Sequence, residues 1–233
     1  MSMAEERYYV PFTKEMKENY TILVPNMLTL HFRLLVQVFK NDGFNMELLE
    51  TDDPSIIETG LKYVHNDTCY PAILVIGQFI SALQSGKYDP HKTALIYFQT
   101  GGGCLASNYI NLLRKALKKA GLDHIPVISV NISGLESASG FQLTLPLIRQ
   151  VICSLIYGDC IMHVSNQTRP YEHSKGETDA LIERWNSELI RQFNRGAGLS
   201  QKEIRANLER IVADFDAITT DEVRSILEDG GKL

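Results

Sequence analysis

The sequence contains little cysteine for its length, with four cysteines in 233 residues. Disulfide scaffolds are short chains dense in cysteine, so that class is excluded. No two cysteines form a Cys-x-x-Cys pair, so a self-contained structural zinc site is not expected. In a reducing cytoplasm the thiols are then core residues, nucleophiles or metal ligands.

The chain also lacks an excess of positive charge and a long apolar run. It carries 23 Lys and Arg against 28 Asp and Glu, for a net charge of −5. A general nucleic-acid binder needs a surface that neutralises phosphates, so no nucleic-acid partner is expected. No apolar run reaches the roughly 18 residues of a membrane span, and residues 1–7 contain no signal-peptide apolar region. We therefore expect a cytoplasmic protein that does not associate with membranes.

The sequence does contain short apolar runs that alternate with helical patterns. Strands are expected at residues 20–24, 46–49, 93–99 and 126–131, with an aromatic lead-in at 7–13 that suits an edge strand. Helices are expected between them at residues 27–40, 55–64, 69–83 and 106–120. This alternation predicts an α/β fold with a Rossmann-like parallel sheet of about four strands and flanking helices.

The alternation ends near residue 140. Residues 143–164, 176–194, 200–216 and 219–228 all have helical patterns, with no strand between them. This predicts an all-helical C-terminal layer. We expect residues 1–140 to form the Rossmann-like domain and residues 141–233 to form a helical extension packed on it.

Two cysteines are expected near the carboxyl edge of the sheet, where open parallel sheets bind ligands. Residues 93–108 read as a buried strand, a turn of Gly101, Gly102 and Gly103, and a helix that begins near Cys104. Cys69 follows a polar break and opens another helix, with Thr68 as the expected N-cap and Pro71 in the first turn. The two thiols are therefore expected at two helix starts on one edge of the sheet.

These positions favour reactive or metal-binding thiolates. The dipole at a helix N-terminus favours the thiolate, which is the form that binds metal or attacks an electrophile. Glycine lets a ligand approach the main chain closely, so Gly101, Gly102 and Gly103 are expected to contact a cluster or substrate. Cys69 and Cys104 would suit an iron–sulfur site, which needs about four ligands. The alternative that both are small buried residues stays open.

Other features of the sequence carry less chemistry. Cys153 and Cys160 share a face of the helix expected from residue 143, and both are expected to be structural. Cysteine and leucine follow the triple glycine, so it fits neither a Walker loop nor the Gly-x-Gly-x-x-Gly fingerprint. His65 precedes Cys69 by four residues, which leaves a Cys–His nucleophile as a third reading.

Four segments carry a family resemblance: RYYVPF at residues 7–12, LKYVHNDTCYP at 61–71, TGGGC with ASNY within 100–109, and SNQTRPYE at 165–172. Together they resemble the activase-associated branch of the 2-hydroxyacyl-CoA dehydratase and benzoyl-CoA reductase superfamily. The resemblance covers roughly residues 7–217. The two cysteine motifs, in this order, are its most specific part.

The resemblance implies an oxygen-sensitive iron–sulfur protein, with a cluster of the 4Fe–4S type held by Cys69 and Cys104. It implies that an ATP-hydrolysing activator, separate or fused, delivers low-potential electrons. In the dehydratases of this superfamily the electron makes a ketyl radical from a 2-hydroxyacyl-CoA, so an acyl-CoA is a further candidate ligand.

The chain departs from the family pattern in two respects. In the family a further α/β module with another cysteine motif follows, and here the chain ends soon after residue 217. The nucleotide-binding motifs of the activator are absent as well. We therefore expect one module of a longer protein, inactive in isolation, which works in a homo- or hetero-oligomer. The alternative is a non-catalytic docking module with structural cysteines.

Overall fold

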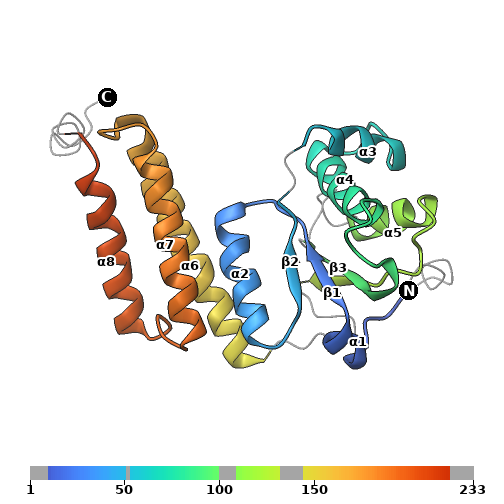
Figure 1. Ribbon diagram of the computed structural model, residues 1–233, viewed down its shortest axis with the longest axis horizontal. Helices are drawn as coiled ribbons and strands as arrows, with labels where there is room; N and C mark the ends of the chain where they lie inside the picture. The colour runs from blue at the N-terminus through green and yellow to red at the C-terminus, as the bar shows by residue number, and fades with distance from the viewer. Residues whose placement is uncertain (1–9, 51–52, 100–108, 132–143, 221–233) are drawn as a thin grey trace. The chain divides into compact units, whose positions relative to one another are not determined.

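The centre of the fold is a four-stranded parallel sheet. The computed structural model describes residues 10–50, 53–99, 109–131 and 144–220 (Figure 1). The strands are β1 (Thr21–Val24), β2 (Met46–Leu48), β3 (Thr93–Gln99) and β4 (Val127–Asn131), in the order β2-β1-β3-β4. All three pairings are parallel. This confirms the predicted α/β, Rossmann-like class and places each strand within one residue of its expected bounds.

The strands form where the sequence has continuous apolar runs. Ile22, Leu23 and Val24 of β1 are buried, as are Ala94, Leu95 and Ile96 of β3. A parallel strand inside a sheet is covered on both faces, so it reads as an unbroken apolar run instead of an alternating one. The short β-branched and leucine-rich runs of this chain meet that requirement.

Among the described residues, four helices and a short 3₁₀ turn accompany the sheet. They are α1 (Lys14–Asn19), α3 (Ser55–Tyr63), α4 (Tyr70–Gln84), the turn η2 (Pro90–Lys92) and α5 (Tyr109–Lys119). The edge strand expected at residues 7–13 is wrong for the described residues 10–13, which are not strand and lead into α1. A main-chain hydrogen bond of 2.9 Å from Tyr20 N to Met16 O ends α1 directly before β1.

Helices α4 and α5 share one core with the sheet. Phe79 and Ile80 of α4 and Leu113 of α5 are all but inaccessible to solvent, and they belong to one apolar cluster with Leu23 and Leu95 of the central strands. This burial removes apolar surface from water and fixes how the two helices lie on the strands. The starts of α4 and α5 are thereby positioned at the sheet.

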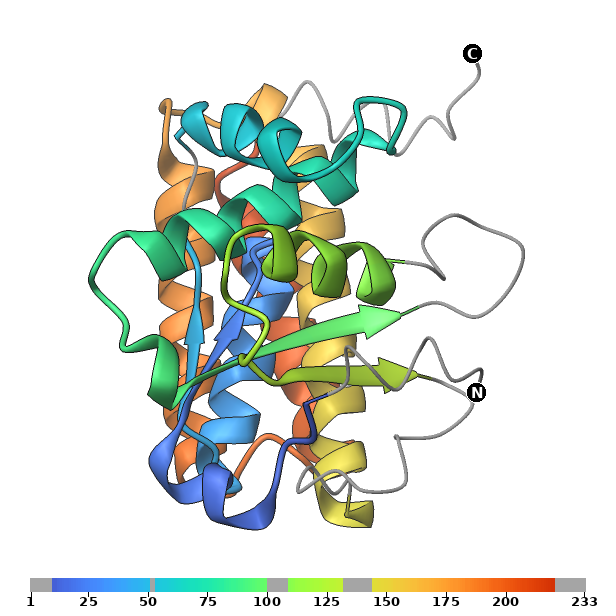
Figure 2. The same cartoon turned by 90° about the vertical axis from the view of Figure 1, so that its right-hand side faces the viewer.

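Helices α3 and α4 lie side by side in unusually close contact (Figures 1 and 2). A Cβ built on Gly60 would lie 2.2 Å from the carbonyl oxygen of Ile73, and one built on Gly77 would lie 1.9 Å from that of Ile56. Only glycine allows two helix backbones to approach this closely. The connection that contains Cys69 is therefore held by a tight helix pair.

The chain divides into two compact units. The first comprises Met1–Thr29 and Asp42–Leu143, and we call it the sheet unit. The second, the helical unit, comprises Leu30–Asn41 and Thr144–Leu233. The helical unit therefore includes most of α2 (Thr29–Asn41), which we had expected with the sheet. The predicted packing of the helical extension on the Rossmann-like domain stays a prediction.

The helical unit contains α2 together with α6 (Leu145–Thr168), α7 (Glu177–Asn194) and α8 (Gln201–Ala217). Helix α2 joins the others through two polar contacts. His31 Nε2 lies 2.9 Å from Asp159 Oδ1, and Arg33 pairs with Glu183 at 2.6 Å. The His31 ring fits against α6 because residue 158 is glycine, whose added Cβ would lie 2.4 Å from the ring.

A buried polar network fixes the turn between α7 and α8. Tyr157 Oη donates to the Gly198 carbonyl at 2.8 Å and accepts from Asn207 Nδ2 at 3.0 Å. The same Asn207 amide donates to Gln192 Oε1 at 2.7 Å. Burial raises the pKa of Tyr157 to about 12, so its hydroxyl keeps the proton that it donates. Because buried polar groups are costly unless paired, this network specifies one arrangement of α6, α7 and α8.

Helix α6 is long and apolar, as a membrane-spanning helix would be. Among the described residues, Leu145–Tyr171 is the one segment long and apolar enough to cross a bilayer. Our reading of the sequence had found no such run. Length and composition alone do not identify a membrane span, because core helices of other proteins share them. In this protein Tyr157, Ser154 and Ser165 of α6 are buried. We treat it as a helix of a bundle.

Candidate functional site

Cys69 lies at the N-terminus of α4, as predicted. Its backbone is extended, with φ −60° and ψ 143°, which is the conformation of an N-cap residue. Its carbonyl accepts the first helical hydrogen bonds, from Ala72 N at 3.0 Å and Ile73 N at 3.3 Å. Pro71 occupies the first turn, where its missing N–H has no partner to lose.

The predicted N-cap, Thr68, is wrong by one residue. Thr68 N donates to His65 O at 3.0 Å, which closes a turn before the helix begins. Cys69 therefore holds the cap position itself, and its side chain makes no capping hydrogen bond. The shift places the thiol directly at the helix start, instead of inside the first turn.

Tyr109 is the partner of the Cys69 thiol. Cys69 Sγ and Tyr109 Oη are hydrogen-bonded, although the two residues lie 40 positions apart in the sequence. Tyr109 is the first residue of α5, and Cys104 precedes it by five positions. Gly101, Gly102, Gly103 and Cys104 lie outside the described residues. The Cys69 thiol therefore contacts a residue that follows Cys104, the other predicted ligand, by five positions in the sequence.

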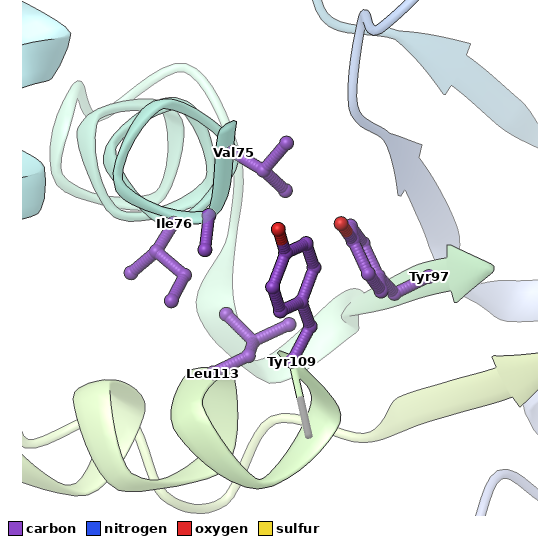
Figure 3. A pocket seen from close by; sticks show the side chains of 6 residues that line it. Val75, Ile76, Tyr97, Tyr109 and Leu113 are labelled. Carbon is purple, nitrogen blue, oxygen red and sulfur yellow. The ribbon is translucent and has the colours of Figure 1, made fainter. Parts of the chain in front are cut away.

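Tyr97 supports this contact from the sheet. It lies on β3 with its side chain buried, and its ring centroid is 5.7 Å from that of Tyr109. Figure 3 shows the two rings neighbouring each other, with their hydroxyls on the same side near Val75. Burial, and then the proximity of Tyr109 and Cys69, raise the pKa of Tyr97 above its ordinary value. Tyr97 therefore stays neutral and brings no charge close to the thiol.

The space beneath the Cys69–Tyr109 contact is a packing gap and not a ligand pocket. It has no room for a water-sized sphere. Small-molecule sites typically need about 300 Å³ or more. The lining is aromatic and aliphatic: Ala72, Val75, Ile76, Tyr97, Tyr109 and Leu113 (Figure 3). A ligand of Cys69 must therefore approach from the side of the thiol that is open to solvent.

The carboxyl end of β1 is tied to α4 by a buried glutamine. Gln78 Oε1 accepts from the main chain of Asn26, just after β1, at 3.0 Å. Strands β1 and β3 are neighbours at the point where the strand order changes direction, which is where doubly wound sheets bind ligands. Helix α4 thus holds the loop after β1 through Gln78 and carries Cys69 at its start.

Three of these residues were not identified by sequence reasoning. Tyr97 and Tyr109 look like ordinary core aromatics, and nothing local signals that they meet across 12 positions and a helix start. Gln78 does leave a signal, because it interrupts the apolar sequence AILVIGQFI of α4. A polar side chain on a buried helix face needs a partner, and that need could have indicated it.

The described part of the chain assembles no metal site by itself. No group of three or more His, Cys, Asp and Glu residues able to hold a metal occurs among residues 10–50, 53–99, 109–131 and 144–220. Cys69 is the only predicted ligand within these ranges. The site as described is therefore one thiol with a hydroxyl partner.

The Cys–His nucleophile receives no support. The His65 side chain is 74% exposed, and its Nδ1 lies 3.2 Å from the Asp67 carboxylate. Within the described ranges no histidine is hydrogen-bonded to Cys69, whose partner is Tyr109. The histidine therefore belongs to the polar turn before α4.

Cys153 and Cys160 take structural positions on α6, as predicted. Cys153 is buried, and Cys160 is partly buried. Burial raises the pKa of both thiols. Both positions agree with a structural role.

The difference in burial between Cys69 and Cys153 predicts which thiol is alkylated first. With limiting iodoacetamide at mildly alkaline pH, we expect Cys69 to be modified faster than Cys153, because Cys153 is buried and burial raises the pKa of its thiol. Peptide mass spectrometry over a time course measures each site separately. The same reaction in denaturant is the control, where the rates should converge. Equal rates in the folded protein would contradict the assignment.

The fourth family-like segment, at residues 165–172, has a structural role in the described contacts. Arg169 pairs with Asp179 at 2.7 Å. The Glu172 carboxylate accepts from the main chain of Gly176 at 2.7 Å and of Thr178 at 2.8 Å. An acidic group that binds free N–H groups stabilises a helix start, so this segment sets the beginning of α7.

No family model matches the sequence, and neither a curated protein nor a solved structure matches it.

Proposed function

We propose that the chain is an iron–sulfur-cluster-holding module of an anaerobic 2-hydroxyacyl-CoA dehydratase or reductase-type system, active in the cytoplasm. In this proposal it receives low-potential electrons from an ATP-dependent activator, which is a separate protein or a fused domain. The observation that carries the proposal is the hydrogen bond between Cys69 and Tyr109. It supports the proposal because Tyr109 follows Cys104 by only five positions in the sequence.

The Cys69 thiol is the type of group that binds an iron–sulfur cluster. It sits at a helix N-terminus and is partly exposed, so a metal can reach it from outside. Clusters are held by cysteine thiolates, and their potentials depend on hydrogen bonds to sulfur and on solvent exposure. A bound cluster would supply one-electron transfer at low potential.

The described residues supply fewer ligands than an iron–sulfur cluster needs. A cluster needs about four ligands, and the described residues supply one, with Cys104 as the proposed second. The remaining ligands have to come from another module, a partner chain or an exogenous group.

Among the described residues, Tyr109, Tyr97 and the start of α4 set the environment of the thiol. Tyr109 Oη can donate to the Cys69 thiolate, which fixes its position and withdraws electron density from the sulfur. Tyr97, kept neutral by its burial, forms an apolar wall that excludes water from one side. In this proposal the assembled enzyme acts on an acyl-CoA. The module alone is inactive.

The test is anaerobic reconstitution with iron and sulfide, followed by metal and sulfide analysis and the visible spectrum. The unsubstituted chain is compared with Cys69→Ser and Cys104→Ser. The matched controls are Cys153→Ser and Cys160→Ser, which remove thiols that lie on α6. With an exogenous thiol or a partner module present to supply the remaining ligands, we expect stoichiometric iron and sulfide in the unsubstituted chain and in both controls, and loss in either of the first two variants.

An equal iron content in Cys69→Ser and the unsubstituted chain would overturn the proposal. So would an absence of iron in the unsubstituted chain, both alone and when mixed with a partner module that supplies thiolates. The rival, a non-catalytic docking module with structural cysteines, is favoured by the lack of a three-ligand group among the described residues. It predicts a fold that stays stable, and iron-free, when both cysteines are replaced.

A further inference from the structure

A cavity of about 470 Å³ lies beside the edge strand β2, within the sheet unit. Its lining comes from β2, the first turn of α3, the last part of α4 and the turn that follows α4. Small-molecule sites range from about 300 to 1,000 Å³, so a small compound fits here. The cavity shares no lining residue with the gap beneath the Cys69–Tyr109 contact and is therefore separate from the candidate site.

The described lining of this cavity carries an excess of negative charge. Three of its residues, Glu47, Glu50 and Asp53, are acidic, and one, Lys87, is basic. Hydrogen bonds from Ser55 lower the pKa of the Asp53 carboxyl group, so it is charged at neutral pH. Charge complementarity selects ligands, and this lining favours cations over anions. The phosphates of a CoA thioester match it poorly.

Glu47 and Tyr88 already hold an ammonium group. Lys87 Nζ forms an ion pair with the Glu47 carboxylate and lies 4.8 Å from the centre of the Tyr88 ring. Tyr88 Oη donates to the same carboxylate oxygen at 2.5 Å, which holds the carboxylate in place. A carboxylate beside an aromatic ring attracts an ammonium group both by charge and by the cation–π interaction. Lys87 thus shows which chemical group this pair recognises.

A ligand can take the place of Lys87. The Lys87 side chain is 64% exposed, and that of its partner Glu47 is 38% exposed. Exposed ion pairs contribute little stability, because water screens them and a long side chain has to be ordered. The Lys87 ammonium is therefore a weak internal competitor that a ligand's ammonium can displace.

The rest of the lining suits an aliphatic chain with a second positive charge. Leu49, Ile56 and Ala82 line the same cavity and are buried. Methylene groups placed against them are removed from water, which is favourable. Glu50 and Asp53 are exposed at the cavity and provide carboxylates for another ammonium group.

We propose that the cavity beside β2 binds a small aliphatic diamine. One ammonium group takes the position of the Lys87 ammonium, on Glu47 and Tyr88, and the methylene chain lies against the apolar lining. The second ammonium group pairs with Glu50 or Asp53. The inference does not depend on the proposed iron–sulfur function, since Cys69 is not part of this lining.

The test is isothermal titration calorimetry of the full chain with cadaverine, at low ionic strength so that charge is little screened. We expect saturable one-to-one binding. Glutarate, which has a similar length and two negative charges, should not bind. Acetyl-lysine methylamide presents one ammonium group as a peptide does, and it should bind at least about tenfold more weakly than cadaverine.

Two substitutions should change the affinity in opposite directions. Glu47→Gln should raise the Kd for cadaverine about tenfold or more, because the carboxylate that accepts the ammonium is lost. Lys87→Met should lower the Kd, because the internal competitor is removed. Glu18→Gln and Lys115→Met make the same charge changes at exposed positions outside the cavity, on α1 and α5. These controls should change the Kd by less than about twofold, since exposed charges far from the ligand are screened.

A third pair of variants tests the aromatic ring. Tyr88→Phe keeps the ring and should bind cadaverine more tightly than Tyr88→Leu. Circular dichroism should show the same fold in every variant. The proposal is wrong if neither the unsubstituted chain nor Lys87→Met binds cadaverine saturably. It is also wrong if Glu18→Gln weakens binding as much as Glu47→Gln, which would show attraction to the net charge alone. Tighter binding of acetyl-lysine methylamide would assign the cavity to a peptide instead.

Discussion

Gly77→Ala is expected to lower the free energy of unfolding of the sheet unit by about 3 kcal/mol, the upper end of the usual cost of overpacking. Helix propensity alone predicts the opposite sign, since alanine is favoured over glycine by about 1 kcal/mol inside a helix. We expect the steric clash of the added Cβ to outweigh the gain in helix propensity. The added Cβ would lie 1.9 Å from the Ile56 carbonyl oxygen and 2.8 Å from its carbonyl carbon, both main-chain atoms of α3. Helix α3 would have to move away from α4.

The measurement is urea unfolding followed by circular dichroism, with Gly86→Ala as the matched control. Gly86 follows α4 with φ +76° and has no atom within 4 Å of an added Cβ. Alanine there costs about 1–2 kcal/mol for backbone conformation alone. A Gly77→Ala variant no less stable than this control would show that α3 and α4 are not in such close contact.

The same variant should also change the reactivity of Cys69. The α3–α4 pair holds the connection in which Cys69 caps α4, and the thiol is bonded to Tyr109. Separation of the two helices would disturb that bond, so we expect faster alkylation of Cys69 in Gly77→Ala than in the unsubstituted chain. Stability and the site are thus linked through two glycines.

The strands and most helix boundaries were predictable because their signals are local. The apolar run that becomes β1 is closed by Pro25 and Asn26, and α3 begins at Ser55 directly after a proline. The start of α4 was predicted from a polar break and Pro71. Only the cap was misplaced, since the turn from His65 to Thr68 leaves Cys69 as the residue with extended backbone.

Long-range pairing was not predictable from the same signals. The contact of Cys69 with Tyr109 spans 40 positions, and α2 meets the C-terminal helices through pairs such as His31 and Asp159, which lie 128 positions apart. No periodicity or propensity encodes such pairs. Gly158 makes room for His31, but in the sequence it is simply a glycine inside an apolar helix.

Phe215→Ala is expected to destabilise the helical unit by about 3–5 kcal/mol, the usual cost of removing a fully buried phenylalanine. Phe215 lies on α8 with no exposed surface. The neighbouring α8 residue Asp214 accepts a hydrogen bond from Trp185 Nε1 at 3.0 Å. Trp185 is the only tryptophan of the chain, so its emission reports on the helical unit alone.

Two separate probes then test whether the units unfold independently. Trp185 emission in urea should show a lower midpoint for Phe215→Ala. Val212→Ala, at an exposed position on the same helix, should change the free energy of unfolding by no more than about 0.5 kcal/mol. The alkylation rate of Cys69 reads the sheet unit in the same samples. If the units are separately cooperative, that rate should stay unchanged at urea concentrations where Trp185 already reports unfolding. A rise of both signals at one concentration would contradict independence, and would mean that the helical unit stabilises the sheet that carries Cys69.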